Sequence, residues 1–226
     1  YIKALMRFNS KINPVPLKRL GAGYHSLDTR TKLASATGIR TAMANKDNIS
    51  GLLPDNCLNI IKNHTTIEYN DFSTVLGSKL LSMDTLDHIE GINQDLSNRI
   101  ANNKYNFTDI ETFIPMLQSK NYTYSAISRA LLHIILDIKT DDIKEFISNN
   151  YVNYAMILGF NKNTGILSEI NKYTKIPLVS KFATFYKEAD NNQRKMLDIN
   201  LKADNLYRMI YMNKTSETLP TEFQRQ

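Results

Sequence analysis

The chain has 226 residues, of which 42% are hydrophobic and 22% are charged, so it is long enough to bury a core and has a globular composition. No apolar run approaches the roughly 20 residues that cross a bilayer, which predicts a soluble protein. Lys and Arg exceed Asp and Glu by six, a balance that favours phosphate-rich partners or else a solvated basic surface.

The cysteine and histidine residues argue against two kinds of site. The single cysteine, Cys57, can form no disulfide within the chain and no multi-cysteine zinc site, and it suits a reducing cytoplasm. The four histidines are scattered without the spacing of metal ligands. The sequence therefore predicts a cytoplasmic protein without a structural metal.

The first residues follow a helical pattern and then an extended one. Ile2, Leu5 and Met6 recur at helical spacing with no capping residue before them, so we expect the chain to begin inside a helix, with sequence missing upstream. Prolines then break the helix, and Val15 and Leu17 alternate with more polar positions as in a short strand.

Two turns follow. Gly21-Ala22-Gly23 predicts the first turn, and residues 33–44 predict a second turn that leads into a helix. The polar run at 45–48 is typical of a helix end or a linker. We therefore place the main domain boundary near residue 48.

The longer second part is predicted to be mostly helical. One helical face carries apolar residues between Phe72 and Leu81, and Thr108 with Glu111 predicts a capping box before a further helix. Thr123 precedes the longest apolar helical pattern of the chain, which ends near Ile138, and Thr140 is expected to cap the helix after it.

The last part of the chain changes character. Residues 154–160 and 176–179 predict short strands on either side of a helix at 165–172, and a final helix is expected at about 199–211. The fold class is therefore mainly α with a small α/β portion, which lies at about 151–211.

The segment Ser35-Ala36-Thr37-Gly38-Ile39-Arg40 is the first candidate site. Hydroxyls at Ser35 and Thr37 would lie in the first turn of a helix, where free N–H groups and the positive end of the helix dipole attract anions. Arg40 can then contact a phosphate with two N–H groups. The alternative interpretation is a simple helix cap.

A second candidate segment, Leu17-Lys18-Arg19-Leu20-Gly21-Ala22-Gly23-Tyr24-His25, lies a short distance upstream. Gly21 and Gly23 allow a backbone to approach a ligand closely, and Lys18 and Arg19 place cations beside them. A tight turn with a surface Lys-Arg pair is the alternative, and His25 either contacts phosphate or completes the turn. Taken together, the two segments predict a nucleotide site.

These two segments resemble the bacterial tRNA(Met) cytidine acetate ligases, a group of the nucleotidyltransferase superfamily. The S-A-T-x-I-R string of Ser35–Arg40 is also similar to the phosphate loop of small nucleotidylyltransferases. The resemblance extends over nearly the whole chain, through Leu80–Met83, Glu90–Gly91, Asn98–Arg99, Lys120–Tyr124, Arg129, Leu158–Phe160 and Ala203–Tyr207.

The resemblance implies an ATP-dependent ligase that activates acetate as acetyl-adenylate and acetylates the wobble cytidine of elongator tRNA(Met). It implies that Arg19 contacts ATP and that Ser35, Thr37 and Arg40 bind its phosphates. Mg²⁺ is expected only because ATP phosphates normally carry it. The family's H-x-G-H histidines are absent from this chain, so the catalytic residues are expected upstream of Tyr1 and this fragment alone is expected to be inactive.

The resemblance also implies two domains. Residues 1–48 would be the end of a nucleotidyltransferase-like α/β catalytic domain, and residues 49–226 a mostly helical domain that binds tRNA(Met) through its anticodon region. Aromatic and cationic side chains suit single-stranded RNA, and the candidates are Lys120, Tyr122, Tyr124, Arg129 and Arg99. Half-buried packing is the alternative role for the tyrosines.

Two other functions remain open at this point. The chain could be a noncatalytic helical RNA-binding module whose turns are only structural. It could also belong to a nucleotidylyltransferase for a small phosphorylated metabolite, since the superfamily shares the phosphate loop. The extensive helical second part argues against the metabolite enzyme.

Overall fold

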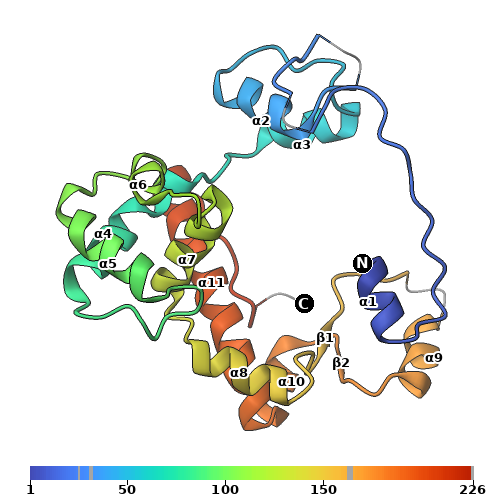
Figure 1. Ribbon diagram of the computed structural model, residues 1–226. Helices are drawn as coiled ribbons and strands as arrows, with labels where there is room; N and C mark the ends of the chain where they lie inside the picture. Colours follow the sequence, from blue (N-terminus) through green and yellow to red (C-terminus); the bar gives the residue numbers. More distant parts are fainter. Residues whose placement is uncertain (25, 31–32, 162–164, 225–226) are drawn as a thin grey trace. The chain divides into compact units, whose positions relative to one another are not determined.

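The computed structural model describes residues 1–24, 26–30, 33–161 and 165–224. It is mostly helical, with a small two-stranded sheet (Figure 1). The chain divides into two compact parts, Tyr1–Thr66 and Ile67–Gln226, which we call unit 1 and unit 2. The predicted boundary near residue 48 falls inside unit 1, so the structure divides the chain later than the polar run at 45–48 suggests.

Unit 1 contains α1 (Ile2–Arg7), α2 (Ala36–Ala44) and α3 (Asp55–Asn63). The helices predicted at its start and after residue 33 are thus confirmed, and Ala42 and Leu58 are buried. The strand predicted at Val15 and Leu17 is wrong. In the described part of the chain this segment pairs with no other strand, and an alternating pattern cannot form a strand without a partner.

Unit 2 is built around α7 (Tyr124–Leu136), whose inner face is buried in one hydrophobic cluster. Thr123 caps this helix as predicted, because its Oγ1 accepts a hydrogen bond of 3.3 Å from the backbone N–H of Ala126. The elements that pack around it or follow it are η1 (Tyr69–Phe72), α4 (Ser73–Ser82), α5 (Gln94–Asn103), η2 (Lys104–Asn106), α6 (Ile110–Leu117) and α8 (Thr140–Ser148).

Two predicted caps of unit 2 are each wrong by one residue. The cap of α6 is Asp109 rather than Thr108, and its carboxylate accepts a 2.9 Å hydrogen bond from the backbone N–H of Thr112. A carboxylate is a stronger acceptor than a hydroxyl, so the helix begins one residue later. Thr140 is the first residue of α8 and Lys139 occupies the cap position.

The end of unit 2 contains the predicted α/β portion. Strands β1 (Ala155–Met156) and β2 (Leu178–Val179) pair in parallel and are connected through α9 (Ile166–Tyr173). They are shorter than predicted, and α10 (Phe182–Glu188) was not predicted. The last helix, α11 (Asn191–Thr215), begins earlier than predicted because Asp190 and Gln193 form a capping box, and it packs against α7. No described helix is long and apolar enough to cross a bilayer.

We expect α7 to be the element on which the stability of unit 2 depends most. Ile134 is 0% exposed, so Ile134→Ala should lower the free energy of unfolding by about 2–5 kcal/mol through lost burial and a residual cavity. Ile147→Ala on α8, where the side chain is 61% exposed, should change it by less than about 0.5 kcal/mol. Urea unfolding followed by circular dichroism measures both. Equal effects would contradict this description of the core.

Candidate functional site

The hydroxyl of Ser35 joins the loop before α2 to the helix itself. Ser35 is the N-cap of α2 and is 0% exposed. Its Oγ accepts a hydrogen bond of 2.9 Å from the backbone N–H of Gly38 and donates one of 2.5 Å to the carbonyl oxygen of Ser26. Both hydrogen bonds lie within the chain, so this hydroxyl acts as a helix cap, as in the alternative interpretation of the sequence.

Gly38 lets the same loop lie directly against the first turn of α2. A Cβ atom at this position would come within 3.0 Å of the carbonyl oxygen of Ser26 and 3.4 Å of the Leu27 backbone. Any larger residue would push the loop away from the helix. The sequence therefore needs glycine here because two backbones meet, in addition to the hydrogen bond that Ser35 makes.

A contact between Gly21 and Leu33 brings the two predicted segments together. Gly21 has φ +82°, and a Cβ atom there would come within 2.5 Å of the Leu33 Cβ. Beside it, the N–H of Ala22 donates a 3.0 Å hydrogen bond to the carbonyl oxygen of Leu33. Only glycine accepts both this backbone conformation and this close approach. The turn that carries Arg19 is thus joined to the segment that begins α2.

The start of α2 has two N–H groups available to an external acceptor. Of the first four N–H groups, that of Gly38 bonds to the Ser35 hydroxyl and that of Ile39 to the Ser35 carbonyl, at 3.0 Å. Within the described part of the chain, the N–H groups of Ala36 and Thr37 form no hydrogen bond. The Thr37 side chain is half-buried. This end of the helix combines free donors with the positive end of the helix dipole, which suits an anion.

Two arginines of unit 1 differ in what they already bind. Arg30 forms a two-bond ion pair with Asp28, at 2.9 and 3.1 Å, and these hydrogen bonds lower the pKa of Asp28 to about 2. Arg40, one turn into α2, is exposed and makes no ion pair within the described residues. Of these two guanidinium groups, that of Arg40 is the one that can take a phosphate.

The other predicted ATP-binding residues lie on the turn before α2. Arg19 donates a 3.1 Å hydrogen bond from Nε to the carbonyl oxygen of Ala22, and its guanidinium lies 5.5 Å from the centre of the Tyr24 ring. These contacts hold Arg19 beside the turn while the side chain stays exposed. Lys18 and Gly23 are also exposed, and His25 lies outside the described residues.

The positive charge of the chain is concentrated in unit 1. This unit contains ten Lys and Arg residues and three Asp and Glu residues, a net charge of +7, whereas unit 2 contains 18 and 19, a net charge of −1. Together they give the +6 of the chain. The composition left open either attraction to phosphate-rich partners or a solvated basic surface, and the division into units shows that the excess positive charge belongs to the unit that contains α2.

The five residues predicted to contact RNA have different surroundings in unit 2. Tyr122 is half-buried against the core and donates a 2.6 Å hydrogen bond to Oδ1 of Asn93. Its surroundings therefore match the alternative role of a half-buried packing residue. Tyr124 is 40% exposed, and partial burial raises its pKa. Arg99 on α5 forms an ion pair of 3.2 Å with Asp95, while Lys120 and Arg129 are exposed.

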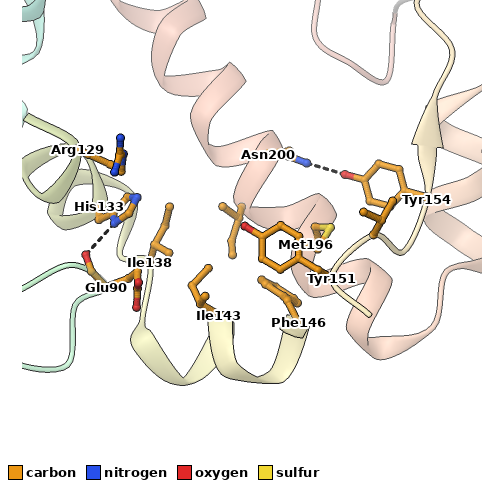
Figure 2. Close-up of a pocket in the computed structure, with 12 residues that line it drawn as sticks. Glu90, Arg129, His133, Ile138, Ile143, Phe146, Tyr151, Tyr154, Met196 and Asn200 are labelled. Carbon is orange, nitrogen blue, oxygen red and sulfur yellow. Dashed lines mark hydrogen bonds between the residues drawn. The ribbon is translucent and has the colours of Figure 1, made fainter. Parts of the chain in front are cut away.

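Sequence reasoning missed a cavity of about 610 Å³ in unit 2 (Figure 2). Of its lining, only Arg129 had been predicted to bind a ligand. The apolar positions around it, such as Ile138, follow the same spacing as core residues, so no signal in the sequence separates them from the core. Within the described residues, no group of three or more His, Cys, Asp or Glu side chains could hold a metal ion.

The chain matches known proteins over most of its length. The model of the family described as HIGH Nucleotidyl Transferase matches residues 1–222. The tRNA(Met) cytidine acetate ligase of Thermoanaerobacter sp. (strain X514) is 30% identical over 223 residues, which are 95% of this chain and 54% of that protein. The protein of the same name from Caldanaerobacter subterraneus subsp. tengcongensis is 33% identical over 94% of this chain and 54% of its own length. The resemblance seen in the sequence is confirmed, and the chain spans about half the length of these curated relatives.

A solved structure shows the same fold. The crystal structure of Thermotoga maritima TmcAL bound with alpha-thio ATP matches with a TM-score of 0.83 at 23% identity, over 99% of this chain and 56% of that one. The apo form of the same protein matches with a TM-score of 0.80 over 93% of this chain. The overall fold of this chain is therefore shared with a solved structure.

We expect the start of α2 to depend on the Ser35 hydroxyl. Ser35→Ala leaves the Gly38 N–H and the Ser26 carbonyl without their partner, which should destabilise this helix end by about 1–3 kcal/mol. Hydrogen exchange of the α2 amides, measured by mass spectrometry, should become correspondingly faster. Ser50→Ala, at an exposed serine of the same unit, should leave that exchange unchanged. Unchanged α2 exchange in Ser35→Ala would show that the hydroxyl does not hold the two segments together.

Proposed function

Because this chain belongs to the HIGH Nucleotidyl Transferase family, we propose that it is part of an ATP-dependent ligase that modifies tRNA(Met). The ligase would activate acetate with ATP as acetyl-adenylate, releasing pyrophosphate, and would then transfer the acetyl group to N4 of the wobble cytidine, releasing AMP. The observation that carries the proposal is the start of α2, where Arg40 and two N–H groups without a partner among the described residues lie in a unit of net charge +7.

In this proposal unit 1 binds the phosphates of ATP. The N–H groups of Ala36 and Thr37 and the guanidinium of Arg40 donate to phosphate oxygens, and the dipole of α2 contributes about 0.3–1 kcal/mol. Arg19 adds a second cation from the adjoining turn. Ser35 acts by holding the turn in shape, because its hydroxyl already makes two hydrogen bonds. These contacts favour the negative charge that grows on departing pyrophosphate.

Magnesium enters this proposal only as the usual companion of ATP phosphates. The described residues contain no carboxylate cluster that could hold the ion. Asp28, the acidic residue that most closely precedes Ser35 in the sequence, is already paired with Arg30. A magnesium ion here would be held chiefly by the phosphates and water. In this proposal the residues of this chain supply donors and positive charge.

Unit 2 would contact tRNA(Met), in its anticodon region. Lys120 and Arg129 offer exposed cations, and Tyr124 offers a ring that is 40% exposed at the start of α7. Single-stranded RNA loops are bound by such stacking surfaces together with cations. Arg99 is proposed as a further contact, for which it would have to exchange Asp95 for phosphate.

Loss of the gene tests the proposed reaction. We expect tRNA(Met) from cells that lack the gene to contain cytidine instead of N(4)-acetylcytidine at the wobble position, as measured by mass spectrometry of the purified tRNA. Reintroducing the gene should restore acetylation. Unchanged acetylation in the deleted strain would refute the proposed function.

Arginine variants of the full-length gene product test the ATP site. Arg40→Gln and Arg19→Gln should each lower acetate-dependent exchange of pyrophosphate into ATP by about tenfold or more, since a hydrogen bond to a charged group contributes about 1.5–3 kcal/mol. The matched control is Arg30→Gln, because Arg30 is already paired with Asp28 and should not contact phosphate. Normal exchange in both Arg40→Gln and Arg19→Gln would remove these residues from the site.

A further inference from the structure

The cavity of about 610 Å³ lies wholly within unit 2, where α7, α8 and α11 approach one another (Figure 2). Its volume is in the range of pockets that hold small ligands, about 300–1,000 Å³. Most of its wall is apolar, and a few polar groups stand at its ends. The lining residues on the apolar side are Ile138, Ile143, Phe146, Val152, Met196 and Ile199.

An exposed tyrosine stands at this cavity in an unfavourable backbone conformation. Tyr151 lines the cavity and is 52% exposed, and its φ of 63° follows a φ of 66° at Asn150. A bulky side chain rarely adopts this left-handed conformation, and such strain collects at binding sites. A hydrogen bond of 2.6 Å from the N–H of Tyr151 to the carbonyl oxygen of Phe146 holds it in place.

A second tyrosine and an amide form one polar end of the cavity. Asn200 on α11 donates a 2.5 Å hydrogen bond from Nδ2 to the hydroxyl of Tyr154. Burial raises the pKa of Tyr154, so its hydroxyl stays protonated and available as a donor. Both residues line the cavity, and Figure 2 shows this hydrogen bond.

The opposite end of the cavity carries Arg129 and His133, one turn apart on α7 (Figure 2). Nδ1 of His133 lies 2.7 Å from the carbonyl oxygen of Glu90, so Nδ1 is the donor of this hydrogen bond and the ring is held in one orientation. Arg129 is exposed. This end can therefore offer a cation and an imidazole ring.

We infer that this cavity receives one unpaired nucleobase of the tRNA substrate, with the base against Tyr151 and the flanking phosphate on Arg129. The inference rests on the proposed function and deepens it. A base has a flat π-face for an aromatic ring and polar edges for groups such as Asn200 and Glu90.

The chemistry of the cavity favours a base over a free phosphate or a phosphorylated metabolite. The wall is mainly apolar, so a free phosphate inside it would lose its hydration without enough hydrogen-bond partners to replace it. Unit 2 as a whole has a net charge of −1, which gives little long-range attraction for phosphate. Contact with a base therefore offers unit 2 a means of binding RNA that does not depend on net charge.

Binding of an unmodified tRNA(Met) transcript to the full-length gene product, measured by fluorescence anisotropy, tests the inference. Tyr151→Asn removes the ring but keeps a residue that accepts the left-handed conformation, so the protein should stay folded with an equal or higher midpoint of thermal unfolding. We expect the Kd for tRNA to rise about tenfold or more. Tyr151→Phe should retain tight binding because it keeps the ring.

The control is Tyr173→Asn, at a tyrosine of α9 that is 81% exposed and does not line the cavity. It should bind tRNA as the wild type does. An unchanged Kd for Tyr151→Asn would overturn the inference and leave the proposed function intact, whereas a wild-type protein that does not bind tRNA(Met) would overturn both.

Transcripts with single abasic sites at unpaired positions identify the base. One such transcript should bind the wild-type protein as weakly as the normal transcript binds Tyr151→Asn. The variant should lose no further affinity for it, because ring and base would act as one pair. If no abasic position shows this coupling, no nucleobase occupies the cavity and the inference is wrong.

Discussion

The arrangement of unit 1 depends on one buried hydroxyl, that of Ser35. It satisfies the N–H of Gly38 and the carbonyl of Ser26, two backbone groups that would otherwise be left unpaired where loop and helix meet. Among the described residues, the N–H groups of Ala36 and Thr37 at the same helix end form no hydrogen bond. The Ser35 hydroxyl thus shapes the helix end that we propose as the anion site.

The two units offer different physical means of binding. Unit 1, with a net charge of +7, attracts phosphate over distance and presents donors at a helix end. Unit 2 is close to neutral and contains a largely apolar cavity, which suits binding through contact and shape. Positive charge gives affinity for any phosphate, whereas a pocket can distinguish one base from another. An enzyme that uses a nucleotide and modifies one base of a large RNA needs both the charge and the pocket.

Local patterns predicted the helices well because capping and apolar spacing are properties of neighbouring residues. Thr123 and the apolar face of α7 were read correctly from a window of about four turns. The strand expected at Val15 failed since strand formation needs a partner that the local pattern cannot reveal. The cap at Thr108 failed by one residue because two adjacent side chains, Thr108 and Asp109, compete for the same position.

The sequence by itself determined which residues could form an anion site, since small residues, hydroxyls and arginines at the start of a helix have that chemistry wherever they occur. Only the tertiary structure decided their roles. In the folded chain the Ser35 hydroxyl bonds to backbone groups of its own chain, Arg30 pairs with Asp28, and Arg40 is exposed. The tertiary structure also gathers residues of α7, α8 and α11 around a cavity. The physical reason is that hydrogen-bond partners and cavities are set by contacts between distant segments, which composition and spacing do not encode.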